Sequence, residues 1–201
     1  MTKKASPSLS EDDLTPLLQA TASRALDTCL RGARGLAVLR DPRAFGLLLQ
    51  LSREDDASAR AEVCRALAAL DDPRAINRLR SLLFDPDATV RDAAFTALAR
   101  LQASEPLQSA EAGLNASFED VHRRGLQVLI EVMRQAAPKT DAGPALELLG
   151  RALNDSFAGV RNEAFKAALN LQVGGGGVRT LRPSEVRRLI LSNRLPLREV
   201  A

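Results

Sequence analysis

Histidine and cysteine supply most metal ligands and many catalytic bases and nucleophiles, and this chain contains very few of either. His122 is the only histidine, and Cys29 and Cys64 are the only cysteines. A catalytic histidine needs a nucleophile or a carboxylate within hydrogen-bond reach, and a zinc site needs several such ligands at short spacings. One histidine and two distant cysteines do not form that set. We therefore expect a non-enzymatic protein without a metal or a cofactor, in which His122 has a structural role.

The two cysteines fall on different positions of a repeated pattern. Cys64 shares its register with Phe95, Leu126 and Phe165, and we expect it to be a small core residue. Cys29 falls on a register that is charged in other repeats, so it could be partly exposed. A reactive thiol is the alternative reading of Cys29, although no neighbouring cation is evident that would activate it.

Acidic residues and glycines form the other groupings that could do chemistry. The clusters Glu54-Asp55-Asp56 and Asp71-Asp72 are interpreted as helix starts, where carboxylates cap the first amides and complement the helix dipole. Residues 174–177 are four consecutive glycines, but the Lys-Ser/Thr pair of a phosphate-binding loop does not follow them. We interpret this stretch as a linker.

The elements that carry these residues repeat along the chain. Asp-Pro-Arg-Ala occurs at residues 41–44 and again 31 residues later, at 72–75. A second block, which begins with Leu and ends with Val-Arg, lies at residues 83–91 and 153–161, and at 114–122 with His122 in place of arginine. Self-similarity at such a period indicates an array of repeated structural units.

Each repeat reads as a pair of amphipathic helices. Asp72 and Pro73 predict the start of the second helix, with aspartate as the N-cap and proline at the first helical position. An insertion around residues 138–143 lengthens one turn, and the chain is rich in the helix formers leucine and alanine. In the second repeat, the apolar stripes at helical spacing are Val63, Leu67 and Leu70, and then Ile76, Leu79 and Leu82.

The net charge of +3 is concentrated at one end of the chain. Residues 174–201 hold six arginines and two glutamates, which gives +4 and leaves −1 for the remainder. No apolar run reaches the length of a membrane span, and the first residues lack the apolar stretch of a signal peptide. With only two cysteines, we expect a cytoplasmic protein that does not bind membranes.

The two blocks resemble HEAT repeats, in particular the short bacterial type that is also called PBS-lyase-like. In that family, Asp-Pro-Arg-Ala opens the second helix of a pair and Asp-x-x-x-x-Val-Arg opens the next first helix, as residues 72–75 and 85–91 do here. The resemblance covers about residues 25–172. It implies an all-α, right-handed α-solenoid of about five antiparallel helix pairs, which acts mainly as a scaffold or adaptor. A bilin-lyase type of function is a weaker alternative.

The resemblance also implies a ladder of ion pairs that runs along the solenoid. Its acidic member lies near the end of a second helix, and its basic member lies early in the next first helix. The matching positions, six residues apart, are Glu54 with Arg60, Asp85 with Arg91, and Asp155 with Arg161. In the fourth repeat both members change together, to Ala116 and His122, which is expected because removing one partner strands the other.

The second helices of a solenoid usually line its concave face, and we expect the partner to bind there. The expected partner is another protein, which presents a helix or an extended acidic peptide. Arg74 and Arg78 lie one helical turn apart and could grip an acidic motif. The expected contact residues are Arg43, Arg74, Asn77, Arg78, Ser81, Gln108 and Glu147.

Nucleic-acid binding is the alternative, through the basic tail. Equivalent positions on the second helices turn from basic to neutral or acidic along the array, so no continuous phosphate-binding stripe results. The chain has no Trp or Tyr on which bases could stack. The remaining phosphate contacts would be Arg179, Arg182, Arg187 and Arg188.

The sequence predicts four parts. These are a flexible polar leader at residues 1–13, the solenoid at 14–173, a glycine-rich linker at 174–183, and a basic amphipathic capping helix and tail at 184–201. The last part could supply the second helix that the fifth repeat otherwise lacks, or it could lead into further protein.

Overall fold

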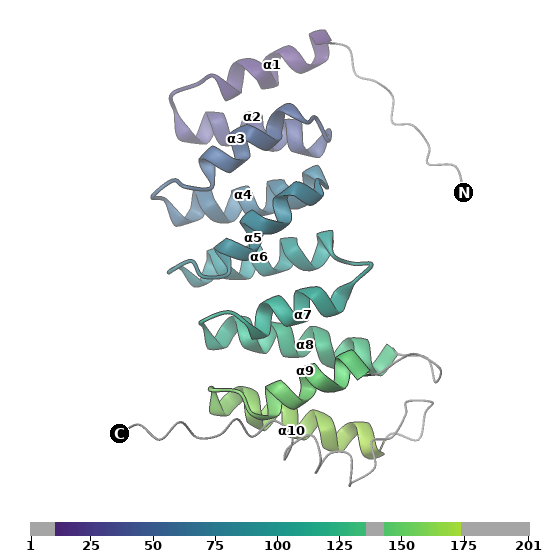
Figure 1. Ribbon diagram of the computed structural model, residues 1–201. Coiled ribbons are helices and arrows are strands. Elements are labelled where there is room, and N and C mark those ends of the chain that lie inside the picture. Colours follow the sequence, from purple (N-terminus) through teal and green to yellow (C-terminus); the bar gives the residue numbers. More distant parts are fainter. Residues whose placement is uncertain (1–10, 136–142, 174–201) are drawn as a thin grey trace, which may run out of the picture. The chain divides into compact units, whose positions relative to one another are not determined.

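Residues 11–135 and 143–173 are described by a computed structural model, and every regular element in these two stretches is helical. The prediction of an all-α chain of repeated helix pairs is confirmed (Figure 1). The chain divides into two compact units, Met1–Leu101 and Gln102–Ala201. No helix among the described residues is long and apolar enough to cross a membrane.

Unit 1 contains three first helices, called A helices below, and two second helices, called B helices. The A helices α2, α4 and α6 pack side by side, α3 packs on α2 and α4, and α5 packs on α6. The helices of unit 1 are α1 (Glu11–Thr21), α2 (Leu26–Val38), α3 (Arg43–Leu51), α4 (Ala57–Leu70), the short 3-10 helix η1 (Pro73–Ala75), α5 (Ile76–Leu82) and α6 (Ala88–Leu101).

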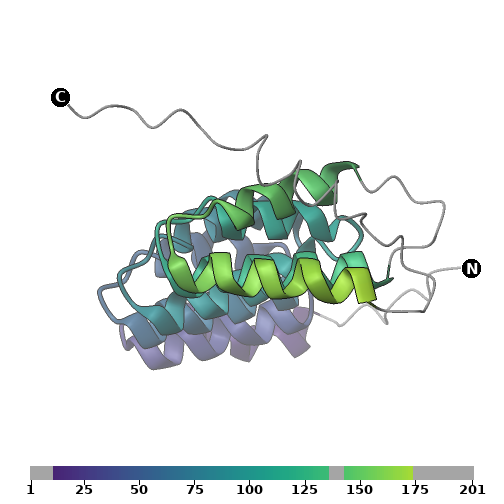
Figure 2. The same ribbon diagram turned by 90° about the horizontal axis from the view of Figure 1, so that it is seen from below.

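Unit 2 continues the alternation of B and A helices. B helix α7 packs on A helix α8, and B helix α9 packs on α10 (Figure 2). Its helices are α7 (Pro106–Leu114), α8 (Glu119–Gln135), α9 (Gly143–Leu153) and α10 (Ala158–Val173). The predicted insertion around residues 138–143 lies almost entirely outside the described residues, between α8 and α9.

The turns after α2 and after α4 each contain one residue in the left-handed conformation. Arg40 and Asp71, 31 residues apart, both have positive φ, of 57° and 58°. After α2, the amide of Arg40 donates to the carbonyl of Ala37 (3.0 Å) and the amide of Asp41 donates to the carbonyl of Leu36 (2.9 Å). These are the two bonds of a Schellman motif, which usually has glycine at the left-handed position.

The predicted stripes form the core of each unit. In unit 1, Val63, Leu67 and Leu79 are fully buried. In unit 2, leucines 126, 129 and 149 lie in one cluster with small residues of α7, α9 and α10. Phe165 differs from the other residues of its register, because its side chain is 48% exposed on α10. Helix α1 begins at Glu11, which falls inside the stretch that the sequence assigns to the polar leader.

Candidate functional site

The Asp-Pro-Arg-Ala block folds into a self-contained turn at the start of each B helix of unit 1. In the first copy, an Asp41 carboxylate oxygen accepts from the amide of Arg43 (2.9 Å), and the carboxylate also binds the guanidinium of Arg43 (Nη2 to Oδ2, 2.6 Å). Asp72 binds the amide (2.9 Å) and the guanidinium (2.6 Å) of Arg74 in the same way. The predicted N-cap at Asp72 is therefore confirmed. The hydrogen bonds from the arginines lower the pKa of both aspartates.

Arg74 is held from a second side by an aromatic ring. Its guanidinium carbon lies 4.4 Å from the centroid of the Phe45 ring, within the range of a cation–π interaction. The side chain of Arg74 is nevertheless 63% exposed. Arg74 is therefore held by two neighbours while most of its side chain faces solvent.

The structure separates Arg78 from the other predicted contact residues. Its guanidinium donates to the hydroxyl (2.7 Å) and to the carbonyl (2.7 Å) of Ser52, which is fully buried at the end of α3. Arg78 therefore ties α5 to Ser52 at the end of α3. The predicted grip of Arg74 and Arg78 on one acidic motif stays a prediction. Asn77 and Ser81 are exposed, and the Ser81 hydroxyl donates to the Asn77 carbonyl (3.1 Å).

In unit 2, two of the predicted residues lie in one hollow between α7 and α9. Gln108 and Glu147 line it, and its volume is about 200 Å³. Arg151 bonds across it to Asn115 and approaches Glu111 at 3.5 Å. The other residues of the lining are Leu107, Pro144 and Leu148.

The ladder positions are paired differently from the expectation. Arg60 binds the carboxylate of Asp85 in the next repeat with two bonds of 2.8 Å. With Glu54, six residues before it, Arg60 bonds only to the backbone carbonyl (2.9 Å), and it also bonds to the carbonyl of Asp55 (2.8 Å). Burial acts to raise the pKa of Asp85, but hydrogen bonds and the charges of Arg60 and Arg91 outweigh it, so that its pKa is lowered.

The bond from arginine to the backbone carbonyl six residues earlier recurs in two other repeats. Arg91 donates to the backbone carbonyl of Asp85 (2.8 Å), and Arg161 donates to that of Asp155 (2.7 Å). The six-residue spacing therefore reflects an arginine that closes its own turn. The carboxylate instead binds the basic residue of the A helix in the preceding repeat: Asp85 binds Arg60, and Asp155 contacts His122.

His122 shows how this position tolerates a change of residue. Its Nδ1 lies 2.7 Å from the carboxylate of Asp155 and its Nε2 lies 2.7 Å from the backbone carbonyl of Ala116. Both contacts match those of Arg60, and the edge of the His122 ring meets Phe157 at a centroid distance of 5.0 Å. Since the carbonyl of Ala116 is the partner, no acidic side chain is needed at that position.

The thiols are buried core groups. Burial raises the pKa of Cys64 to about 12 and also raises that of Cys29. The burial of Cys64 is confirmed, whereas the expectation that Cys29 is partly exposed is wrong, because α1 covers it and its Sγ lies 3.4 Å from the carbonyl of Thr21. Within the described stretches, no group of His, Cys, Asp and Glu could hold a metal ion.

Two predicted regions cannot be placed in this way. Arg179, Arg182, Arg187 and Arg188, with the linker and the capping helix, lie outside the described residues.

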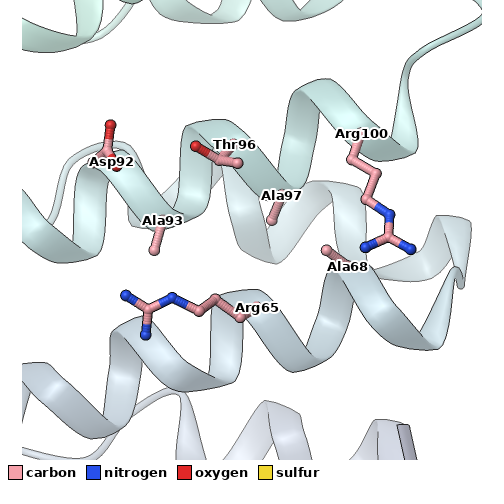
Figure 3. Close-up of a pocket in the computed structure, with 7 residues that line it drawn as sticks. All are labelled: Arg65, Ala68, Asp92, Ala93, Thr96, Ala97 and Arg100. Carbon is pink, nitrogen blue, oxygen red and sulfur yellow. The ribbon is translucent and has the colours of Figure 1, made fainter. Parts of the chain in front are cut away.

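The sequence did not predict a hollow between the A helices α4 and α6, which is flanked by Arg65 and Arg100 (Figure 3). The only signal for it was the row of alanines on these helices, which also reads as close helix packing.

The chain was compared with solved structures and with curated proteins. Crystal structures of two engineered proteins from the Northeast Structural Genomics Consortium are similar to the chain. One is 24% identical, with 81% of this chain and 80% of that chain covered and a TM-score of 0.45. The other is 21% identical, with 90% and 51% covered and a TM-score of 0.47, so this chain spans about half of its length. No curated protein matches the sequence.

The family model for HEAT repeats matches residues 9–99 and, in an overlapping second placement, residues 45–131. Together the two matches span more than half of the 201 residues. With repeated A and B helices in both units, the chain belongs to the HEAT-repeat family.

Proposed function

We propose that this chain is a non-enzymatic protein-interaction module that binds its partner through exposed side chains of the B helices. HEAT-repeat proteins commonly serve as interaction scaffolds. The observation that carries the proposal for this chain is Arg74, which is fixed by Asp72 and by the ring of Phe45 and yet remains largely exposed. Arginine is among the residues most often found at the energetic centre of interfaces.

The position of Arg74 leaves donors for a partner. Its Nε and Nη2 engage Asp72, and the guanidinium has further N–H groups that can bind a carboxylate. Because the side chain is already held in place, little additional conformational entropy is lost on binding. Asn77 follows Arg74 by three residues and Ser81 follows Asn77 by four, and all three are exposed, a spacing at which helical side chains are neighbours. We propose that an acidic helix or extended peptide binds along these side chains.

Unit 2 offers a separate surface of opposite character. Glu111 and Glu147 line the hollow between α7 and α9, where Arg151 is already engaged with α7. This surface suits a basic or amide side chain of a partner. Gln108, which also lines the hollow, supplies an amide that can donate and accept.

Affinity capture with the full chain tests the proposal. Three baits are compared in nuclease-treated lysate: the wild type, Arg74→Glu, and Arg31→Glu as a control for an exposed arginine on the A helix α2. We expect the wild type and the control to retain the same partner protein. Arg74→Glu should retain about tenfold less of it, or even less, since an interface hot spot contributes 2 kcal/mol or more. Equal retention by all three baits would remove the B-helix surface from consideration.

The basic tail gives a different outcome in the same experiment. Retention that requires nucleic acid, and that falls by orders of magnitude between low and moderate salt, would indicate phosphate contacts. That result would favour the tail over the B helices.

A further inference from the structure

A second candidate surface lies between the A helices α4 and α6 of unit 1. It is a hollow of about 220 Å³, called the α4–α6 hollow below. Its floor consists of three buried alanines, Ala68 from α4 and Ala93 and Ala97 from α6. None of the residues that line it belongs to the B-helix surface proposed above, so the two surfaces can be tested separately.

Two arginines bracket the alanine floor. Figure 3 shows Arg65 extending along α4 beneath Ala93, and Arg100 extending from α6 toward Ala68 at the opposite end. The side chain of Arg65 is 57% exposed, and its Nη1 pairs with Glu62 at 3.0 Å. Arg100 is exposed, and within the described part of the chain its guanidinium makes no hydrogen bond or ion pair.

The size of the hollow indicates the class of its occupant. A volume of about 220 Å³ is below the range of roughly 300–1,000 Å³ that is typical of cofactor and drug-sized ligand sites. It suits one or two side chains. The alanine floor is apolar, and the two ends are positively charged.

The charges around the hollow favour a peptide over a nucleic acid. Glu62 pairs with Arg65 at 3.0 Å and with Arg34 at 2.9 Å. Asp92 lies on α6 eight residues before Arg100, so carboxylates alternate with arginines in this region. In Figure 3, Asp92 points to the side of α6 that faces away from Arg65. A continuous polyanion along the hollow would also pass the carboxylate of Glu62, whereas separate carboxylates of a peptide can meet the arginines alone.

We propose that the α4–α6 hollow binds an acidic segment of a partner protein, with an apolar side chain on the alanine floor and a carboxylate at each arginine. Ala93 and Arg100 are seven residues apart on α6, which corresponds to on the order of 10 Å along a helix. The segment therefore carries two acidic side chains about that far apart, with an apolar residue between them.

Selection from a random peptide library, displayed on phage and applied to the intact chain, tests this proposal. The baits are the wild type, the double variant Arg65→Glu/Arg100→Glu, and Arg31→Glu as the matched control, an exposed A-helix arginine outside both surfaces. A fourth bait, Arg74→Glu, identifies peptides that bind to the B-helix surface. We expect the wild type and the control to enrich peptides with two acidic residues around an apolar residue. The double variant should bind those peptides at least tenfold more weakly, in fluorescence anisotropy with the synthetic peptides.

A charge swap distinguishes a direct contact from a general electrostatic effect. Replacement of both peptide acids by lysine should restore binding to the double variant and abolish binding to the wild type. Ala68→Leu, which fills the floor, should weaken binding without any change of charge. The proposal is overturned if the double variant enriches the same acidic peptides, or if the wild type enriches none. It is also overturned if a single-stranded 20-nucleotide DNA competes with the peptide for the site. Loss of binding with Arg74→Glu alone would assign the acidic peptides to the B-helix surface instead.

Discussion

Removal of the Asp85 carboxylate should strongly destabilise unit 1. In Asp85→Asn, Arg60 loses a carboxylate that it binds with two bonds of 2.8 Å, while its bonds to two backbone carbonyls remain. The two side chains are only 13% and 6% exposed. Breaking a buried ion pair from one side costs about 3–5 kcal/mol, and partial solvent access of Arg60 reduces this to about 2–4 kcal/mol. For a unit of this size, that corresponds to a fall in melting temperature of about 10–20 °C.

A matched surface pair separates this effect from the loss of any charge. Arg65→Met on the same helix α4 removes an ion pair whose members are 57% and 26% exposed, and should cost no more than about 0.5 kcal/mol. A double-mutant cycle of Arg60→Met and Asp85→Asn should show a coupling of about 1.5 kcal/mol or more. The assay is thermal and urea unfolding of the full chain, followed by circular dichroism.

The pH dependence gives an independent check. The pKa of Asp85 is lowered in the folded chain from its ordinary value of 3.8, so the unfolded chain binds the proton first as pH falls. The stabilisation is therefore complete at neutral pH and is lost as pH falls through the lowered folded-state value. The difference between wild type and Asp85→Asn should shrink accordingly. An Asp85→Asn variant as stable as the wild type at pH 7, or an equal difference at pH 7 and pH 2, would refute the reasoning.

Three further predictions concern packing, the ladder and the thiols. Gly125→Ala should lower the stability of unit 2 by about 1–3 kcal/mol, because an added Cβ would lie 2.7 Å from the carbonyl oxygen of Ala110. Gly46→Ala should instead raise the stability of unit 1 by about 0.5–1 kcal/mol, because there is open space around Gly46. Both are measured by thermal unfolding, and effects of the same sign would contradict the packing. His122→Ala should cost about 2–3 kcal/mol while His122→Arg, which restores the residue of other repeats, should cost far less; equal losses would show that the ring itself is required. Cys64, whose pKa is about 12, should react with a thiol reagent at pH 8 only after denaturation, and rapid labelling of the native chain would contradict its burial.

The sequence predicts the local structure of this chain well. Helical periodicity locates the stripe that contains Leu67, and the Asp-Pro pair at residue 72 marks a helix start, because both depend on interactions within a few residues. The positions of the ladder were also recognisable. Their partners were not, because Arg60 selects a carboxylate 25 residues away, and the spacing in the sequence suggested one only six residues away.

Long side chains account for most of what could not be predicted. Arg74 lies on η1 and Arg78 lies four residues later on α5, yet Arg78 reaches back to Ser52 and Arg74 stays at the surface. Helical spacing predicts which face of a helix carries a residue. It does not predict where an arginine guanidinium ends, because the side chain is long enough to reach a neighbouring helix. The hollow bracketed by Arg65 and Arg100 was missed for the same reason, since neighbouring repeats contribute its two ends.

The arginine content of this chain therefore says less about its partner than the net charge suggests. Arg43 and Arg74 neutralise the aspartates that cap their own helices. Arg60 and Arg161 are bound to backbone carbonyls of the turns before them, which are the acceptors that a helix-rich repeat leaves open at each turn. A repeat fold with many such turns uses arginine to close them, because one planar guanidinium can donate to two carbonyls and a carboxylate at once. Within residues 11–135 and 143–173, these arginines therefore stabilise the fold, and their number does not by itself indicate a polyanion as the partner.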